Sequence, residues 1–312
     1  MTGTNMSDIP AAGGQIHDDT GSLAGELQPV SNPVGRKGLS ARRWPPSLVA
    51  GVIMVGVTVL VGLVSFVWTP YSIDSTGDGG RLAGPSADFW IGTDRLGRDL
   101  FSQLMTGAQS AIIVAVAAVL IAGALGVVIG ILAAGTTKTV DVALLNLIDL
   151  MIAFPTLLLA MLVVTVRGAS LSSAVLAIGI SGSAVIARVT RVNASRVLRE
   201  DYVTASIASG TGWFGVVARH VLPNILPMLL VQLMILAGSA ILAEASLSYL
   251  GLGAPPPAPS WGRMLKEAQS TLSVQPWGAI VPGIAIAWTV LGLNLLGDGL
   301  RERLDPSLRG DR

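Results

Sequence analysis

The sequence has no cysteine, only three lysines and two histidines, and few charged residues of any kind. Without cysteine, disulfide bonds and thiolate metal sites are excluded, although that absence does not identify a compartment. Charged residues make up 12% of the 312, whereas hydrophobic residues make up 51% and the mean hydropathy is +0.67. Soluble domains carry a charged share of about 25%. The chain is therefore expected to lie in a membrane.

The scarcity of lysine also excludes ATP hydrolysis by this chain. A phosphate-binding loop ends in Gly-Lys-Ser or Gly-Lys-Thr, so that backbone N–H groups and the lysine hold the phosphates. None of Lys37, Lys138 and Lys266 follows a glycine. We expect no catalytic residue, and no cofactor-binding or metal-binding residue, in the chain.

The N-terminal residues 1–44 hold no long apolar run and are rich in Gly, Ser, Asp and Asn. Such a segment cannot bury enough surface to offset the entropy of ordering, so we expect a disordered cytoplasmic tail. A cleaved signal peptide would need a short apolar core and a small-residue cleavage site, and neither is present before Leu48. The first apolar segment is expected to stay as an anchor.

Six segments are long and apolar enough to be membrane spans. A bilayer core about 30 Å thick requires about 20 apolar residues in a helix. The segments are approximately residues 48–68, 111–134, 147–166, 171–187, 225–247 and 279–296. The third contains Pro155, so it depends on neighbouring helices to satisfy its backbone. We expect an all-α, polytopic membrane protein with a six-span domain over residues 45–300.

The distribution of Lys and Arg orients the chain. An even number of spans places both termini on one side, and positively charged loops favour the cytoplasm. Fourteen of the twenty Lys and Arg residues lie in the two terminal tails, the loop at Lys138 and the connector after the fourth span, and six lie in the other loops. The connector includes the loop over residues 194–223, and its five cations are Arg188, Arg191, Arg196, Arg199 and Arg219. We therefore expect that connector and both termini, including residues 301–312, to be cytoplasmic in a multi-pass membrane protein.

Ion-coupled transport by this chain alone is one possible activity. Such carriers normally keep ionisable groups within the membrane, because a carboxylate or histidine has to bind and release the ion. The middles of four predicted spans hold none; Asp149 and Glu244 lie near span ends, and His17 and His220 lie outside the spans. An external motor that acts on the cytoplasmic surface is favoured, and an ion-coupled carrier or a channel-like protein stays open as the alternative.

The connector between the fourth and fifth spans has a spaced pattern of small residues, glycine and proline. Thr204-Ala205-Ser206 is followed by Gly210 four residues later and by Leu222-Pro223 twelve further on. We expect a short helix that ends at Ser209, because glycine suits the left-handed backbone of a helix cap, and a next helix that starts at Pro223. A plain turn between spans would also use glycine and proline, but the joint spacing favours a specialised element.

This spacing resembles the signature loop of ATP-binding-cassette importer permeases, which usually reads Glu-Ala-Ala before the same glycine and Leu-Pro positions. The flanking segments "REDYVTASIASG", "RHVLPNILP", "IGTDRLGRDLFSQLMTGA", "FPTLLLAMLV", "EASLSYLGLG" and "PSWGRML" resemble the dipeptide, oligopeptide and nickel branch, in its second, C-type permease subunit. The resemblance covers approximately residues 45–308. Thr204 replaces the family's glutamate and Ser206 its second alanine, so any ion pair of that glutamate with a motor subunit is absent.

The resemblance implies a type I importer fold with a cytoplasmic coupling helix, and a set of partners. These are a homologous second permease, two ATPase subunits that carry ATP and Mg²⁺, an extracytoplasmic solute-binding protein and the lipid bilayer, with no nucleic acid. The implied ATPase-docking residues are Tyr202, Thr204, Ala205, Ser206, Gly210, Leu222 and Pro223. On the opposite face, Asp94, Arg98 and Asp99 are candidates for contact with the binding protein or for the lip of the substrate entrance. Asp99 is equally suited to cap the helix that follows.

Polar residues inside the spans allow two interpretations. They either line a route for a peptide backbone or hydrogen-bond neighbouring helices, and helix packing is favoured for each. They are Ser181, Ser183, Gln232, Ser239, Thr289 and Asn294. Packing also explains the Gly-x-x-x-Gly element at Gly126 and Gly130. From the resemblance, the expected cargo of an alternating-access pathway is short peptides, with nickel or another small solute as the competitor.

Overall fold

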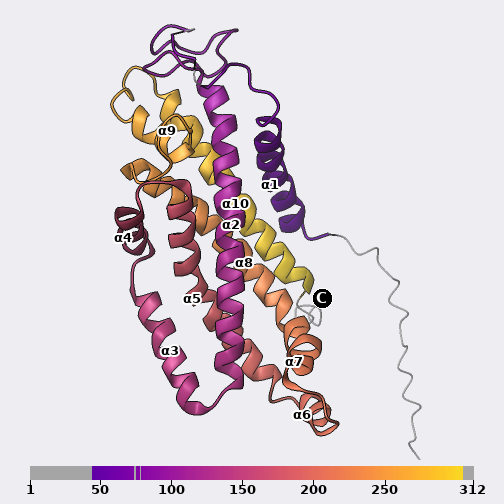
Figure 1. The fold of residues 1–312 in the computed structure, drawn as a ribbon. Helices are drawn as coiled ribbons and strands as arrows, with labels where there is room; N and C mark the ends of the chain where they lie inside the picture. Colours follow the sequence, from indigo (N-terminus) through magenta and orange to yellow (C-terminus); the bar gives the residue numbers. More distant parts are fainter. Residues whose placement is uncertain (1–43, 74, 78, 305–312) are drawn as a thin grey trace, which may run out of the picture. The chain divides into compact units, whose positions relative to one another are not determined.

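The computed structural model describes residues 44–73, 75–77 and 79–304 (Figure 1). Nearly all the regular structure among them is helical, as the composition predicts. The helices are α1 (Pro46–Val64), α2 (Leu100–Gly135), α3 (Lys138–Ala153), α4 (Thr156–Arg167), α5 (Leu171–Val197), α6 (Asp201–Ala208), α7 (Trp213–Val216), the π-helical turn η1 (Val217–Val221), α8 (Leu222–Leu250), α9 (Trp261–Ala268) and α10 (Trp277–Leu304). The predicted tail over residues 1–44 lies outside the described residues apart from Trp44, and so does the end of the C-terminal tail.

Five helical stretches are long and apolar enough to cross a membrane, namely α1, α2, α5, the continuous stretch Trp213–Leu250 that contains α8, and α10. α3 and α4 make a sixth if the pair counts as one span, but they meet at 87°. The structure therefore corrects the third predicted span, which is two helices rather than one. Pro155 causes the break, because proline lacks a backbone N–H and forces the residue before it, Phe154, into an extended conformation.

α2 and α5 pack along each other in the middle of the bundle (Figure 1). A β-carbon at Gly126 would lie 2.6 Å from that of Ile186, and one at Gly130 would lie 2.5 Å from that of Thr190. These distances are too short for any side chain, so glycine is what allows the two backbones to approach. The predicted packing role of the Gly-x-x-x-Gly element is confirmed.

The other long helices surround this pair. α1 packs on α10, α10 packs on α8, α8 contacts both α2 and α5, and α3 and α4 pack on α5. Figure 1 shows α6, α7 and the turn between α2 and α3 at one end of the bundle, with α9 and the segment before α2 at the other. We call these the α6 end and the α9 end.

Candidate functional site

The short helix α6 ends in the backbone conformation that the sequence predicts. Gly210 has φ +90°, its N–H donates to the Ile207 carbonyl at 2.9 Å, and the Thr211 N–H donates to the Ser206 carbonyl at 3.1 Å. These two hydrogen bonds define a Schellman motif, which satisfies the last carbonyls of a helix. A β-carbon at Gly210 would meet nothing within 4 Å. The backbone angle, and not a lack of space, therefore requires glycine here.

One face of α6 is fixed to the bundle. Val203 is fully buried in a cluster with Val216, Val221 and Ile225, which come from α7, η1 and α8, and the cluster extends to α5. These apolar contacts connect α6 to a cluster that both neighbouring long helices share.

A polar contact also explains one departure from the family pattern. Ser206 Oγ donates to Thr211 Oγ1 at 2.9 Å and lies 3.1 Å from His220 Nε2, and the Tyr202 ring packs edge-on against the His220 ring. Alanine at position 206 would have no hydroxyl for either polar partner. Ser206 thus joins α6 to the π-helical turn that leads into α8.

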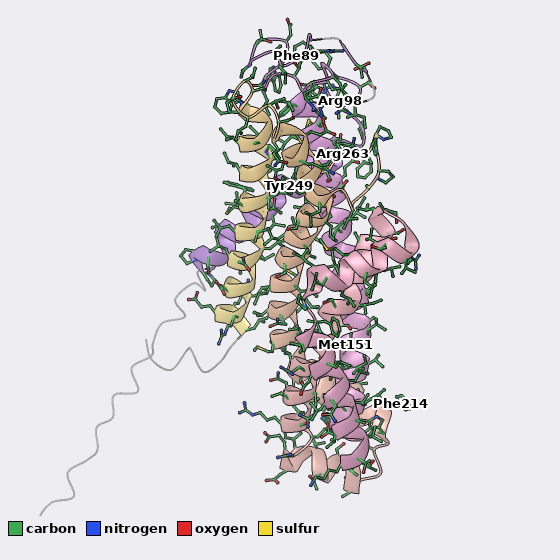
Figure 2. All side chains as sticks on the ribbon, turned by 90° about the vertical axis from the view of Figure 1, so that its left-hand side faces the viewer. Phe89, Arg98, Met151, Phe214, Tyr249 and Arg263 are labelled. Carbon is green, nitrogen blue, oxygen red and sulfur yellow. The ribbon has the colours of Figure 1, made fainter. Side chains whose placement is uncertain are left out.

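The opposite face of α6 and the adjoining α7 are exposed and partly apolar. Tyr202 and Ile207 are about half exposed, and Phe214 is 87% exposed. Figure 2 shows Phe214 at the α6 end, far from Phe89 and Arg98. Aromatic and aliphatic side chains grouped at an exposed end are typical of a protein contact surface. We call Tyr202, Thr204, Ala205, Ile207 and Phe214 the α6 surface.

The predicted docking residues Leu222 and Pro223 lie beneath this surface, at the start of the next long helix. Leu222 and Pro223 begin α8, and Pro223 lies in its first turn, as expected. The chain enters α8 through η1, where the Leu222 N–H donates to the Val217 carbonyl, five residues back. Ile207 and Phe214 were missed from the sequence. The aromatic pair after Gly212 in an otherwise polar connector was the available signal for the latter.

At the α9 end, the three predicted binding-protein-facing residues lie largely inside the protein. Arg98 Nη2 pairs with Asp94 Oδ2 at 2.6 Å and with Glu267 Oε2 of α9 at 2.9 Å, and the Arg98 and Asp94 side chains are only 10% exposed. Asp99 Oδ2 accepts hydrogen bonds from the Ser102 N–H at 2.8 Å and from its hydroxyl at 2.6 Å. The cap interpretation of Asp99 is confirmed, and contact with a binding protein stays a prediction for all three.

The polar residues of the spans separate into two groups. Thr289 Oγ1 lies 3.0 Å from Thr58 Oγ1, which joins α10 to α1, and Ser183 Oγ donates to a carbonyl of its own helix. Three others line a cavity of about 200 Å³ between α4, α5 and α8, together with a residue that sequence analysis missed. These four are Thr156, Ser181, Gln232 and Ser239. The structure thus brings uncharged hydrogen-bonding groups together around a partly open cavity, where Thr156 and Ser239 are exposed.

The acidic residues near the span ends have partners within the chain. Asp149 pairs with Arg188, and Asp141 accepts two hydrogen bonds of 2.6 Å from Arg191, so both pairs tie α3 to α5. Glu244 is buried and accepts a hydrogen bond from Ser248 Oγ at 2.6 Å. These contacts give each carboxylate a structural role that needs no transported ion.

Comparisons with known proteins agree with this geometry. Residues 126–310 match the family model described as "Binding-protein-dependent transport system inner membrane component". The chain is 36% identical over 261 residues to the dipeptide transport system permease protein DppC of Alkalihalophilus pseudofirmus, covering 84% of this chain and 86% of that protein.

Two further relatives and one solved structure extend the comparison. Identity is 40% over 228 residues with the di/tripeptide transport system permease protein DppC of Pseudomonas aeruginosa, covering 73% of this chain and 75% of that one. Identity is 36% over 262 residues with the glutathione transport system permease protein GsiD of Pectobacterium atrosepticum, covering 82% and 87%. The fold is similar to a chain of the MetNI methionine ABC transporter in an inward-facing conformation, with a TM-score of 0.53, 14% identity and coverage of 66% of this chain and 96% of that chain.

Proposed function

Because the chain belongs to the family of binding-protein-dependent transport system inner membrane components, we propose that it forms half of the pathway of an ATP-binding-cassette importer for short peptides. The chain is a non-catalytic permease subunit of the inner membrane, and ATP binds to separate ATPase subunits. A second permease and a solute-binding protein complete the assembly that membership of this family implies.

The α6 surface is the observation on which the proposed mechanism depends. In this mechanism, one of the two ATPase subunits holds the α6 surface in a groove, and ATP binding closes the two ATPase subunits together. The exposed side chains supply the contact, and the buried cluster around Val203 passes the displacement to α5 and α8. The two long helices then move as a unit and open the pathway outward, which is alternating access driven from the cytoplasm.

This mechanism requires the α6 end to lie in the cytoplasm. Arg196, Arg199 and Arg219 lie in the connector that holds α6, and all three are exposed. Since cytoplasmic loops carry an excess of Lys and Arg, their position supports this orientation and a cytoplasmic location of both termini.

Short peptides are the proposed cargo. The relatives are described as permeases for dipeptides, for di- and tripeptides and for glutathione. The cavity between α4, α5 and α8 supports this choice, because the Gln232 amide can donate to and accept from a peptide backbone regardless of the side chains carried. The Ser181 and Ser239 hydroxyls already donate to Thr156 Oγ1 and to the Ile235 carbonyl, so they offer acceptors to the peptide. Nickel or another small solute is the competing cargo of the same class of importer.

Transport by the reconstituted complex tests the proposal. The two permeases and the ATPases are placed in liposomes, with the binding protein and a labelled dipeptide on the side of the α9 end. We expect uptake that requires ATP on the α6 side and is competed by unlabelled dipeptide but not by nickel. Uptake driven by a proton or sodium gradient, with this chain alone and without ATP, would establish the ion-coupled carrier instead.

A further inference from the structure

A pocket of about 470 Å³ opens at the α9 end between α9, the loop that follows α8 and the turn between α4 and α5. Its volume lies within the range of about 300–1,000 Å³ that is usual for small-ligand sites. Its charged wall consists of Arg95, Arg263, Lys266 and Glu267. We call it the basic pocket, and none of its three cations was singled out as a site residue from the sequence.

The single carboxylate in the wall is already shared. Glu267 Oε1 accepts a hydrogen bond of 2.8 Å from Arg263 Nε, and Glu267 Oε2 accepts one of 2.9 Å from Arg98 Nη2. The Nη1 atom of Arg263 is buried and has no hydrogen-bond partner among the described residues. Because this atom has almost no surface open to the pocket, Arg263 contributes positive charge to the wall and not a free donor that a ligand could reach.

Among the residues that the structure describes, the other two cations have no carboxylate partner. Arg95 Nη1 donates only a long hydrogen bond of 3.3 Å to Ser270 Oγ, and Lys266 forms no ion pair within the described part of the chain. Lys266 Nζ lies over Gly251, whose φ of +88° and missing β-carbon leave room for the ammonium group at the end of α8. Both side chains are exposed at the pocket, where a ligand can reach them.

An excess of guanidinium and ammonium groups in a concave site suits a carboxylate, because each can form charge-assisted hydrogen bonds with its oxygens. We propose that the basic pocket binds a carboxylate on the outer face, either the C-terminal carboxylate of the arriving peptide or an acidic side chain of the binding protein. This assignment rests on the proposed function for its orientation and for the source of the anion.

The location also explains why the predicted binding-protein-facing residues are not the accessible ones. Asp94 and Glu267 neutralise Arg98 inside the protein. Arg95 lies three residues before Arg98, and Lys266 is next to Glu267. These two exposed cations carry the charge that a partner can reach. The buried network thus holds α9 against the segment before α2, and the basic pocket lies on its outer side.

Acetylation of lysine tests the pocket directly. The assembled complex is treated with an acetylating reagent, and modification of Lys266 is followed by mass spectrometry with Lys138, at the α6 end, as the internal reference. A dipeptide with a free C-terminus, present at about ten times its dissociation constant, should slow acetylation of Lys266 about tenfold if it occupies the pocket. The same dipeptide with a C-terminal amide should protect little. Protection by the binding protein alone, without peptide, identifies the protein side chain as the source.

Transport kinetics give a second, independent readout. The double variant Arg95→Gln and Lys266→Gln removes two exposed charges, and Arg81→Gln removes an exposed charge outside the pocket as the control. If the peptide supplies the carboxylate, the double variant should raise KM about threefold to tenfold for the free acid and abolish the preference for acid over amide. If the binding protein supplies it, the affinity of the binding protein should fall by a similar factor for both peptides.

Two results together would exclude a carboxylate site in the basic pocket. In the first, neither peptide nor binding protein slows the acetylation of Lys266. In the second, the double variant has the same KM and the same affinity for the binding protein as Arg81→Gln. Both results would be obtained in a complex that still imports peptide. Failure of the proposed function would instead show as a wild-type complex without ATP-driven uptake, while the protection of Lys266 could still be measured.

Discussion

The α6 end and the α9 end of the bundle differ in whether their side chains find partners within the chain. At the α9 end, Arg98 lies between Asp94 and Glu267, with nine-tenths of its side chain buried, and Asp99 caps α2. At the α6 end, Phe214 is 87% exposed and the outer face of α6 has no partner within the described residues that would cover it.

The Arg98 network is thus satisfied within the chain, whereas the α6 surface is left uncovered and is the part that we propose to contact another chain. A buried ion network stabilises only when all of its members are present, so the α9 end is sensitive to change from within. An exposed apolar surface contributes little to the isolated chain and much to a complex. Substitutions at the α9 end should therefore affect stability first, whereas those on the α6 surface should affect coupling and assembly.

The largest effect is expected from Arg98→Met. It leaves Asp94 and Glu267 without their shared cation, and loss of one partner from a buried ion pair costs about 3–5 kcal/mol. The melting temperature of the purified complex in detergent should fall by many degrees. Arg81→Met is the matched control, because Arg81 is exposed. An equal melting temperature for both variants would mean that the network does not hold the α9 end together.

Gly210→Val should have the next largest effect. Position 210 has φ +90°, and a residue with a β-carbon there stores about 1–3 kcal/mol of strain, more when it is β-branched. Membrane insertion should be unchanged, but ATP hydrolysis should no longer be coupled to uptake, or the ATPases should detach. Uptake and ATPase rate measured on the same liposomes separate these outcomes.

Gly212→Val provides the control in the same loop. Gly212 has φ −69° and ψ 163°, which valine adopts readily, and a β-carbon there also meets nothing within 4 Å. The two variants differ in the backbone angle at the substituted position. Normal transport by Gly210→Val would remove the α6 cap from the mechanism.

Phe214→Ser should weaken assembly without affecting the bundle. A hot-spot aromatic contributes about 1–2 kcal/mol or more to a protein interface, so the affinity for the ATPase subunit should fall about tenfold. Val67→Ser is the control, since Val67 is 91% exposed just beyond α1. Both variants should keep the wild-type melting temperature. Co-purification of the ATPase with Phe214→Ser at the wild-type level would place the interface elsewhere.

The smallest effect is expected from Gln232→Leu in the cavity between α4, α5 and α8. Loss of one hydrogen bond to a peptide backbone costs about 0.5–1.5 kcal/mol, so the uptake rate should fall about threefold to tenfold at unchanged ATPase coupling. Asn294→Leu removes an amide from α10, which does not line that cavity. If both variants lowered uptake equally, Gln232 would act in helix packing and not in the pathway.

The sequence predicts features that depend on a single backbone position better than features that depend on the meeting of distant segments. The cap at Gly210, the place of Pro223 in the first turn of α8 and the Asp99 cap follow from the local conformational needs of glycine, proline and aspartate. The pairing of Arg98 with Glu267 spans 169 residues. Nothing local to either residue indicates that α9 packs beside the segment before α2.

Exposure is the second property that the sequence does not reveal. Ile207 and Phe214 are apolar residues of the kind found in protein cores. They are exposed because they lie on the sides of α6 and α7 that face away from the bundle. The break at Pro155 shows an intermediate case, because proline predicts an interruption but not the angle of 87° between α3 and α4.

Cross-linking of position 204 to the ATPase tests the central claim most directly. The chain has no cysteine, so Thr204→Cys on the exposed face of α6 is the only thiol that it would present. Paired with a cysteine in the ATPase groove, it should form a disulfide in the assembled complex and react with a membrane-impermeant maleimide only from the ATPase side, while Val67→Cys should form no such disulfide. Labelling of Thr204→Cys from the binding-protein side, or a complex active in transport in which position 204 touches no ATPase, would contradict the account.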